Sequence, residues 1–173
     1  MEIGEFNAQD AADARALALV WAAIPRWADG IVVRRPYSSV DDLAEVAARL
    51  ARTWSGRDLD TALAHHPRIG ERPTGAGAEA AASRSEQAAM SAAGDDVTAR
   101  MAAGNRAYED RFGRVFLIRA AGRSPEEMLD ALETRLRNDD AAEADEALTQ
   151  LAEIALLRLR DAIDETTHAR MTA

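Results

Sequence analysis

Along most of the chain, apolar residues recur every three or four positions, whereas strict alternation of apolar and polar residues is scarce. A period of three to four residues places apolar side chains on one face of a helix, so the pattern predicts an all-α, single-domain multi-helix bundle. The helices that we expect cover residues 10–21, about 40–54, about 58–65, about 83–93, about 97–112, about 125–137 and about 143–164.

Proline, glycine and small polar residues mark several of these helix ends. Ser39 is a good N-cap for the second helix, and Gly56 marks its end. We expect Pro25 to close the first helix and Pro67 to stop the third, because the residue before a proline is pushed out of the helical region. Gly113 suits the left-handed conformation that follows many helices.

Two further N-caps are predicted from short motifs. Ser83-x-x-Glu86 is typical of a capping box, and Ser124-Pro125-Glu126-Glu127 combines an N-cap, a first-turn proline and two acids. Between the helices, residues 69–82 are rich in Gly, Pro and Ala and are expected to form a loop, and residues 114–121 are the one stretch that could be extended. We therefore expect one domain over residues 1–165 and a frayed C-terminal tail over 166–173.

The amino-acid composition excludes several classes of function. The 173 residues are 47% hydrophobic and 29% charged, as in a soluble globular domain. There is no cysteine, which excludes thiolate catalysis and Cys-based metal sites, and all 21 basic residues are arginine, which excludes lysine Schiff bases. A net charge of −9 is unfavourable for binding nucleic acid or an anionic membrane. No signal peptide, membrane-spanning run, phosphate loop or dinucleotide fingerprint is present, so we expect a cytoplasmic protein without an organic cofactor.

The run from His65 to Gly70 is the most concentrated chemical feature of the chain. Imidazole titrates near neutrality, and a loop at a helix end can aim it into a cleft as an acid or base. The alternative is a helix C-cap in which a histidine serves the last carbonyls. Adjacent histidines point in different directions and no third histidine lies at ligand spacing, so we expect no metal site.

Ser83 to Gln87 presents a hydroxyl, a carboxylate and an amide within five residues. Ser83 and Glu86 could be the two halves of a capping box and nothing more. The N–H groups at a helix N-terminus also bind anions, so the same turn could hold a substrate carboxylate or carbonyl.

Arg158 falls on an apolar helix face at 100° per residue, whereas Arg160 falls on the opposite, solvated face. The apolar face consists of Leu151, Ile154, Ala155 and Ala162. A guanidinium there must be paired or used, so it could bind a carboxylate or ureido group, pair with a helix carboxylate, or extend to water. The stripe Asn105, Tyr108 and Phe112 is interpreted as core.

Taken together in this order, four motifs resemble the 2-oxo-4-hydroxy-4-carboxy-5-ureidoimidazoline (OHCU) decarboxylase family. They are His66-Pro67-Arg68-Ile69-Gly70, Ser83-x-x-Glu86-Gln87, Asn105-x-x-Tyr108-x-x-x-Phe112-Gly113-x-x-Phe116 and Leu157-Arg158-Leu159. Arg35-Pro36-Tyr37 and Arg137-Asn138 extend the resemblance to nearly the whole chain. One departure is Ala89, which stands where the family often has glycine.

The resemblance implies a cofactor-free, metal-free homodimer that converts OHCU, a small molecule, to (S)-allantoin in the last step of urate degradation. It implies that His66 is the catalytic acid/base and acts with Glu86. The residues that it implies for substrate binding are Pro67, Ser83, Arg84, Ser85, Glu86, Gln87, Ile118, Arg119, Ala120, Ala121, Gly122 and Arg158. Electrons left by departing CO₂ can delocalise onto oxygen, so no electron-sink cofactor is required.

Two other functions remain open at this point. A non-enzymatic helical module would bind a partner helix in an apolar groove and would need no polar cleft around His66. A helical hydrolase would use His66 with Glu86 to activate water and would release no CO₂.

Overall fold

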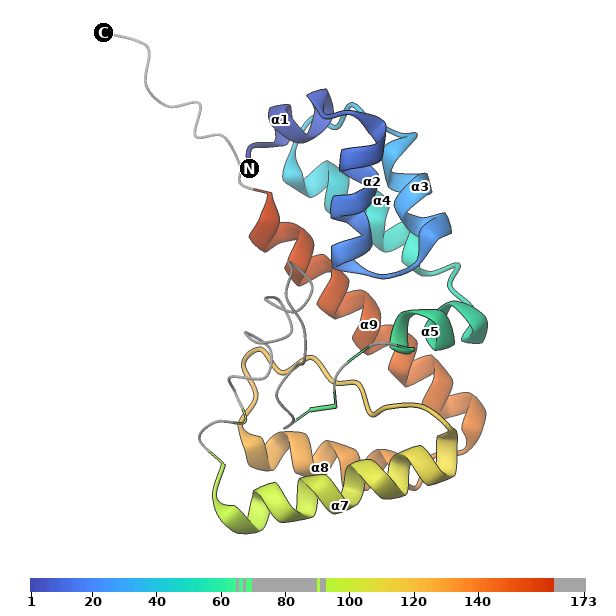
Figure 1. Cartoon of the computed structure of the whole chain (residues 1–173), viewed down its shortest axis with the longest axis vertical. Coiled ribbons are helices and arrows are strands. Elements are labelled where there is room, and N and C mark those ends of the chain that lie inside the picture. The colour runs from blue at the N-terminus through green and yellow to red at the C-terminus, as the bar shows by residue number, and fades with distance from the viewer. Residues whose placement is uncertain (65, 67, 70–89, 91–92, 164–173) are drawn as a thin grey trace, which may run out of the picture. The chain divides into compact units, whose positions relative to one another are not determined.

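The computed structural model describes residues 1–64, 66, 68–69, 90 and 93–163. These residues contain eight helices and no β-strand, which confirms the predicted all-α fold. The helices are α1 (Ile3–Ala8), α2 (Ala11–Trp21), α3 (Pro25–Val32), α4 (Val40–Ala51), α5 (Gly56–Leu63), α7 (Asp95–Phe112), α8 (Pro125–Arg135) and α9 (Asp140–Ala162) (Figure 1). None of these helices is both long enough and apolar enough to cross a membrane.

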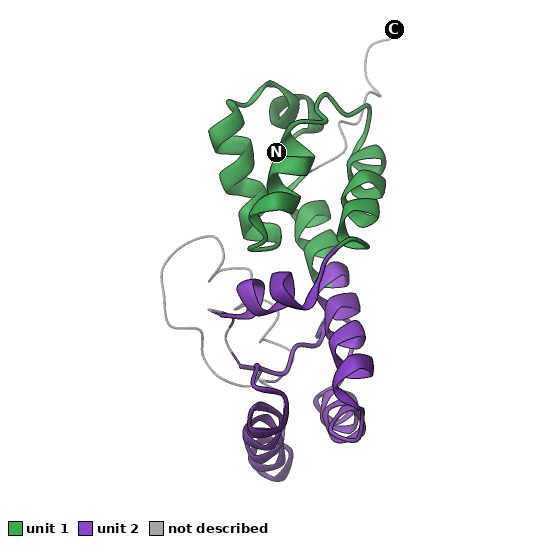
Figure 2. Ribbon diagram, turned by 90° about the vertical axis from the view of Figure 1, so that its right-hand side faces the viewer, with its two compact units in different colours: residues 1–53, 154–173 green, residues 54–153 purple. Residues whose placement is uncertain are grey.

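The chain divides into two compact units, coloured separately in Figure 2. One unit consists of residues 1–53 and the chain from Ile154 onward, and the other consists of residues 54–153. Helix α9 contributes residues to both units. The single domain over residues 1–165 stays a prediction, and the tail 166–173 lies outside the described residues.

Aromatic side chains form the core of the first unit. Phe6 of α1 packs against Trp21 of α2 with ring centroids 5.6 Å apart, and Trp21 meets Trp27 of α3 edge-on at 6.5 Å. Each ring is almost fully buried. The indole N–H of Trp27 donates to the carbonyl of Ala47 at 3.0 Å, so its polar atom is paired within the apolar surroundings.

Helices α1 and α3 are absent from the sequence prediction. Pro25, expected to close the preceding helix, is instead the first residue of α3. Proline is well suited to this position, because the first helical N–H has no partner within the helix and the proline φ is already helical. Helix α1 has only six residues, too few for a periodic pattern.

In the second unit, the expected caps are present at two helices, and a third helix has a cap that the sequence analysis did not predict. Gly113 ends α7 with a φ of 67°, in the left-handed region. Ser124 caps α8, and its hydroxyl and Glu127 form both halves of a capping box. Ser55 does the same with Asp58 at α5, so Gly56 begins this helix and does not end the previous one. The predicted helix at 83–93 lies almost wholly outside the described residues.

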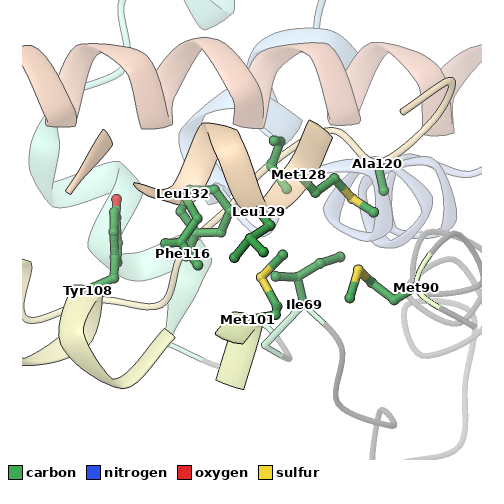
Figure 3. Packing of buried hydrophobic residues seen from close by; sticks show 10 residues of the cluster. Ile69, Met90, Met101, Tyr108, Phe116, Ala120, Met128, Leu129 and Leu132 are labelled. Atoms are coloured by element: carbon green, nitrogen blue, oxygen red, sulfur yellow. The ribbon is translucent and has the colours of Figure 1, made fainter. Parts of the chain in front are cut away.

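An apolar cluster fills the second unit between α7, α8 and the segment that joins them (Figure 3). Helix α7 contributes Met101 and Tyr108, and α8 contributes Met128, Leu129 and Leu132. The joining segment, in which we predicted a possible extended stretch over residues 114–121, has neither helix nor strand. It nevertheless buries Phe116, Ile118 and Ala120 in the cluster. Ile69, three residues after His66, packs into the same cluster, which therefore joins two predicted site segments.

Candidate active site

His66 follows the C-terminal end of α5. This helix ends at Leu63, two residues earlier than predicted, and Ala64 is its C-cap. The backbone N–H of His66 donates to the Leu63 carbonyl at 3.1 Å, and the residue is half-buried. A histidine in this position is held by the end of a helix, and the Nε2 atom of its ring is buried. His65 and Pro67 lie outside the described residues.

Arg68 links the chain after His66 to helix α7. Its Nε and Nη2 atoms donate to the two carboxylate oxygens of Glu109, with Nη2 and Oε2 2.8 Å apart. This two-pronged geometry fixes orientation as well as distance. The hydrogen bonds from Arg68 hold the pKa of the Glu109 carboxyl below its usual range. Sequence reasoning did not identify Glu109, because its partner lies 41 residues away.

Asn105 makes a second link between α7 and the same segment. Its side-chain amide donates to the Ile69 carbonyl at 2.9 Å. Asn105 and Tyr108 are both buried, which confirms that this stripe belongs to the core. Asn105 and Glu109 are four residues apart on one helix, so both links leave the same face of α7.

Within the predicted substrate-binding segment Ile118–Gly122, some of the hydrogen-bond donors are already paired with other parts of the protein. The amide of Arg119 donates to the Gln150 side chain at 2.9 Å, and its guanidinium pairs with Glu153 at 2.8 Å. The amides of Ile118 and Ala120 donate to no acceptor among the described residues. Gly122 has a φ of 79°, which a residue with a side chain rarely adopts.

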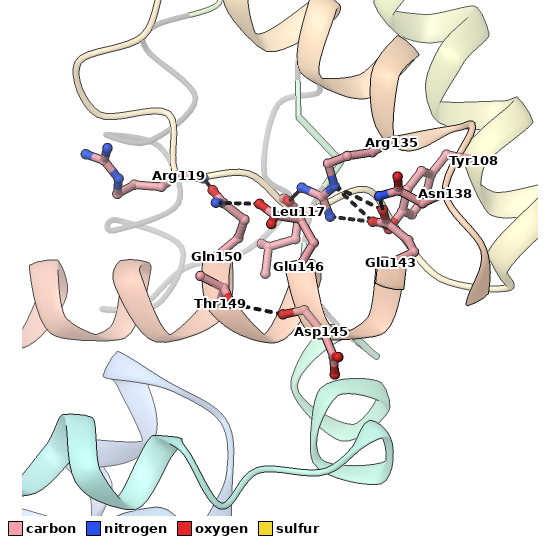
Figure 4. Close-up of polar contacts among 10 residues, drawn as sticks. All are labelled: Tyr108, Leu117, Arg119, Arg135, Asn138, Glu143, Asp145, Glu146, Thr149 and Gln150. Carbon is pink, nitrogen blue, oxygen red and sulfur yellow. Dashed lines mark hydrogen bonds and ion pairs between the residues drawn. The ribbon is translucent and has the colours of Figure 1, made fainter. Parts of the chain in front are cut away.

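A buried polar network supports this segment from α8 and α9 (Figure 4). Arg135 donates to the Leu117 carbonyl at 2.7 Å and pairs with Glu143. Glu143 also accepts from the Tyr108 hydroxyl and, at 2.9 Å, from Asn138. Burial and the bond to Glu143 raise the pKa of Tyr108. Sequence reasoning missed Arg135, Glu143 and Gln150, since an isolated polar residue in a helix gives no sign of burial.

Arg158 belongs to the other unit. It is half-buried, and its Nη1 atom donates to the Val20 carbonyl at 3.2 Å. Arg160 is exposed and pairs with Asp41 at 2.8 Å, as expected for the solvated face. The turn formed by Ser83, Arg84, Ser85, Glu86 and Gln87, together with Ala89, lies outside the described residues.

A pocket of about 510 Å³ opens beside the last turn of α5. It is lined by Asp60, Leu63, Ala64, Glu109, Asp110, Gly113, Arg114 and Val115. Three of these side chains are acids and one is a base, so the lining lacks the excess of positive charge that would attract an anionic substrate. None of the predicted site residues appears in this lining. Among the described residues, no three His, Cys, Asp or Glu side chains are grouped closely enough to hold a metal ion.

Comparison with known proteins gives a consistent result. A family model described as OHCU decarboxylase matches residues 7–160. A 2-oxo-4-hydroxy-4-carboxy-5-ureidoimidazoline decarboxylase from Amia calva is 32% identical over 142 residues, which are 79% of this chain and 80% of the relative. An enzyme of the same name from Haloferax volcanii is 30% identical over 128 residues, covering 73% of this chain and 74% of the relative.

Solved structures agree at the level of the fold. The crystal structure of an OHCU decarboxylase in the presence of (S)-allantoin superposes with a TM-score of 0.71 and 23% identity, covering 83% of this chain and 94% of the other. The range matched by the family model includes the segments of His66, Glu86, Ile118–Gly122 and Arg158. The chain belongs to the OHCU decarboxylase family.

Proposed function

We propose that this chain decarboxylates OHCU to (S)-allantoin, the last step of urate degradation, and that His66 delivers the proton that sets the configuration. The observation that carries the proposal is the family match over residues 7–160, which includes every residue to which we give a role. The relatives that share about 30% of their residues with this chain carry the name of this activity.

The reaction follows from the structure of the substrate. OHCU carries its carboxylate and hydroxyl on one ring carbon, and the neighbouring carbon carries the ureido group and a double bond to ring nitrogen. When the bond to the carboxylate breaks, CO₂ leaves and its electron pair moves through that double bond onto the ring nitrogen and the ring carbonyl oxygen. The hydroxyl carbon becomes a carbonyl as its proton is lost, the ring nitrogen gains a proton, and the ureido carbon takes another.

The substrate itself therefore accepts the electrons, which supports a reaction without a metal or an organic cofactor. The role of the protein is to align the breaking bond with the ring π system and to stabilise the charge that develops. We assign binding of the substrate carboxylate and hydroxyl to His66 and Glu86. The remaining contacts around these two groups are assigned to Pro67, Ser83, Arg84, Ser85 and Gln87.

Backbone donors and an arginine complete the proposed site. The amides of Ile118 and Ala120, which have no acceptor among the described residues, are available for the developing oxyanion. Arg119, Ala121 and Gly122 are the other proposed substrate-binding residues of this segment. Arg158 binds the ureido or ring carbonyl end, for which its planar fork of donors is suited.

His66 gives the reaction its stereochemistry. Spontaneous decay of OHCU yields racemic allantoin, because solvent protonates either face of the ring. An imidazolium held on one face protonates only that face, and the imidazole is then protonated again from solvent. The half-buried position of His66 after α5 supports this role. We further propose that the enzyme acts as a cytoplasmic homodimer, as the family resemblance implies.

The test is to generate OHCU in situ from urate with upstream enzymes and to follow CO₂ release and allantoin optical activity with and without the chain. We expect faster decay to a single (S) enantiomer, unchanged by a chelator. Folded protein that gives no acceleration would contradict the proposal and favour the helical binding module. Consumption of OHCU without CO₂ would favour the hydrolase.

Two variants then assign the proton donor. His66→Asn keeps a polar side chain of similar size but cannot donate from imidazolium, so acceleration and enantioselectivity should both be lost. His65→Asn is the matched control at the neighbouring position and should retain both. A His66→Asn enzyme with full rate and full selectivity would exclude His66 as the acid.

A further inference from the structure

His66 is fixed at its N-terminal side by α5, and the structure provides a separate anchor on its C-terminal side. The anchor consists of the Arg68–Glu109 ion pair and the hydrogen bond from Asn105 to the Ile69 carbonyl. Both contacts come from α7, and they hold the residues two and three positions beyond His66. The backbone on each side of the imidazole is thus attached to a different helix.

The geometry of the ion pair is directional. Arg68 uses Nε and Nη2, so the guanidinium plane is aligned with the plane of the Glu109 carboxylate. A lysine in place of Arg68 would supply the charge without this alignment. The side chains of Arg68 and Glu109 are 44% and 25% exposed, and pairs this accessible to water add little to stability.

A well-aligned but weakly stabilising pair points to a role in position. We propose that Glu109, acting through Arg68, is a positioning residue that holds the His66 imidazole where it delivers its proton. This inference rests on the proposed function, because it assumes that His66 is the acid. Asn105 and the buried side chain of Ile69 secure the same segment to the core.

The structure also supplies a matched control. Arg100 of α7 pairs with Glu133 of α8 at 2.6 Å, and their side chains are 50% and 42% exposed. This pair has the same chemistry and involves the same helix, but it holds no segment next to a predicted site residue. Glu133→Gln therefore measures the loss of an exposed ion pair alone.

The test compares Glu109→Gln with Glu133→Gln. In Glu109→Gln the side chain keeps one acceptor and presents an N–H₂ donor to the guanidinium, so the fork is broken without a change of size. Displacement of a catalytic group by about 1 Å can cost about 100-fold in rate, so we expect kcat to fall by about 10- to 100-fold with little change in KM. Arg68→Lys should give a smaller fall in kcat.

The deciding readout is the enantiomeric excess of the allantoin. A displaced imidazole delivers its proton late, solvent competes for both faces, and the excess of the (S) form should fall in Glu109→Gln and stay complete in Glu133→Gln. Each variant is assayed at an enzyme concentration at which spontaneous racemic decay is negligible, so loss of folded protein alone would not change the enantiomeric excess. Circular dichroism confirms that both variants are folded.

The two proposals fail in different ways. A wild-type chain that does not accelerate OHCU decay overturns the proposed function, and this inference falls with it. Wild-type activity that is lost in His66→Asn, combined with full kcat and full enantiomeric excess in Glu109→Gln, overturns the positioning role alone. A fall in enantiomeric excess of equal size in Glu133→Gln would also overturn it.

Discussion

Arg135 and Glu143 form an ion pair from which water is almost completely excluded, their side chains being 7% and 1% exposed. The arginine of α8 also lies over the Phe116 ring, with Cζ 4.7 Å from the ring centroid. Every partner of Glu143 is a donor: Arg135, Tyr108 and Asn138. Such a pair is maintained only because each charge compensates for the desolvation of the other.

Replacement of Glu143 by glutamine should therefore be strongly destabilising. It leaves the Arg135 charge buried without a counter-charge, and losses of about 3–5 kcal/mol are usual for this change. The free energy of unfolding in urea measures the effect. Glu133→Gln breaks an exposed pair instead and should cost less than about 1 kcal/mol. Equal losses of unfolding free energy in the two variants would contradict burial of the Arg135–Glu143 pair as the cause of the destabilisation.

The two tyrosines of the chain should resist ionisation in the folded state. Burial raises the pKa of Tyr37 to about 12, and burial together with the bond to Glu143 raises the pKa of Tyr108. In a titration followed at 295 nm, the unfolded chain in urea should be half-ionised near its usual value of about 10. In the folded chain at most about a tenth of the tyrosine should be ionised at pH 11, and half-ionisation near pH 10 would contradict the burial of these rings.

The same shifts predict a loss of stability in alkali. The folded-state pKa of Tyr37 lies above its unfolded value, so its stabilising contribution is complete below about pH 10 and is lost as the pH rises towards 12. Urea unfolding at a series of pH values checks this. Tyr37→Phe should reduce the decline between pH 10 and 12, because one of the two shifted groups is removed.

Gly104→Ala should destabilise the second unit. A Cβ at this position of α7 would lie 2.6 Å from Cδ2 of Leu132, which is fully buried in α8. The cost of overpacking, about 1–3 kcal/mol, should exceed the gain of about 1 kcal/mol in helix propensity. At Gly4 nothing lies within 4 Å of the added atom, so Gly4→Ala should be neutral or slightly stabilising. Thermal unfolding should show a lower Tm for Gly104→Ala and no decrease for Gly4→Ala, and equal decreases would exclude close helix packing as the cause.

Arg158→Lys tests the proposed substrate contact. Loss of a two-pronged bond to a polar group of the substrate should lower kcat/KM by about 10- to 100-fold, the equivalent of about 1.5–3 kcal/mol. Arg160→Lys changes the exposed residue on the opposite face and should leave kcat/KM within about twofold of wild type. Equal effects in both variants would exclude a specific role for Arg158.

Local signals account for the parts of the fold that the sequence predicted well. Helix α2 begins within one residue of its predicted start, α7 ends at Gly113, and α8 starts directly after its Ser124 cap, as expected. These boundaries depend on neighbours within a few residues. Helix α3 was not predicted, because a proline can follow the end of one helix or begin the next. The position of Pro25 in the sequence does not distinguish these two roles.

The candidate site was less predictable, because its supports are distant in sequence. The residue types of His66 and Arg158 suggest a functional role, because one is an imidazole after a helix and the other is a charge on an apolar helix face. Glu109 and Gln150, in contrast, resemble any polar residue of a helix surface. Their importance comes from partners 41 and 31 residues away, Arg68 and Arg119. Only packing of the helices brings these pairs together. The roles of the site residues themselves stay predictions that the experiments above address.

The segment between α7 and α8 has no neighbouring strand in the described part of the chain, but its alignment along the core is fixed as it would be in a sheet. Arg135 holds the Leu117 carbonyl and Gln150 holds the Arg119 amide, two residues further on. Between and beside these points, Phe116, Ile118 and Ala120 enter the apolar cluster. Insertion or deletion of one residue here would shift the register, moving both backbone groups away from their helices and turning the inward side chains outward. The length of this connection is therefore as strongly constrained as its composition.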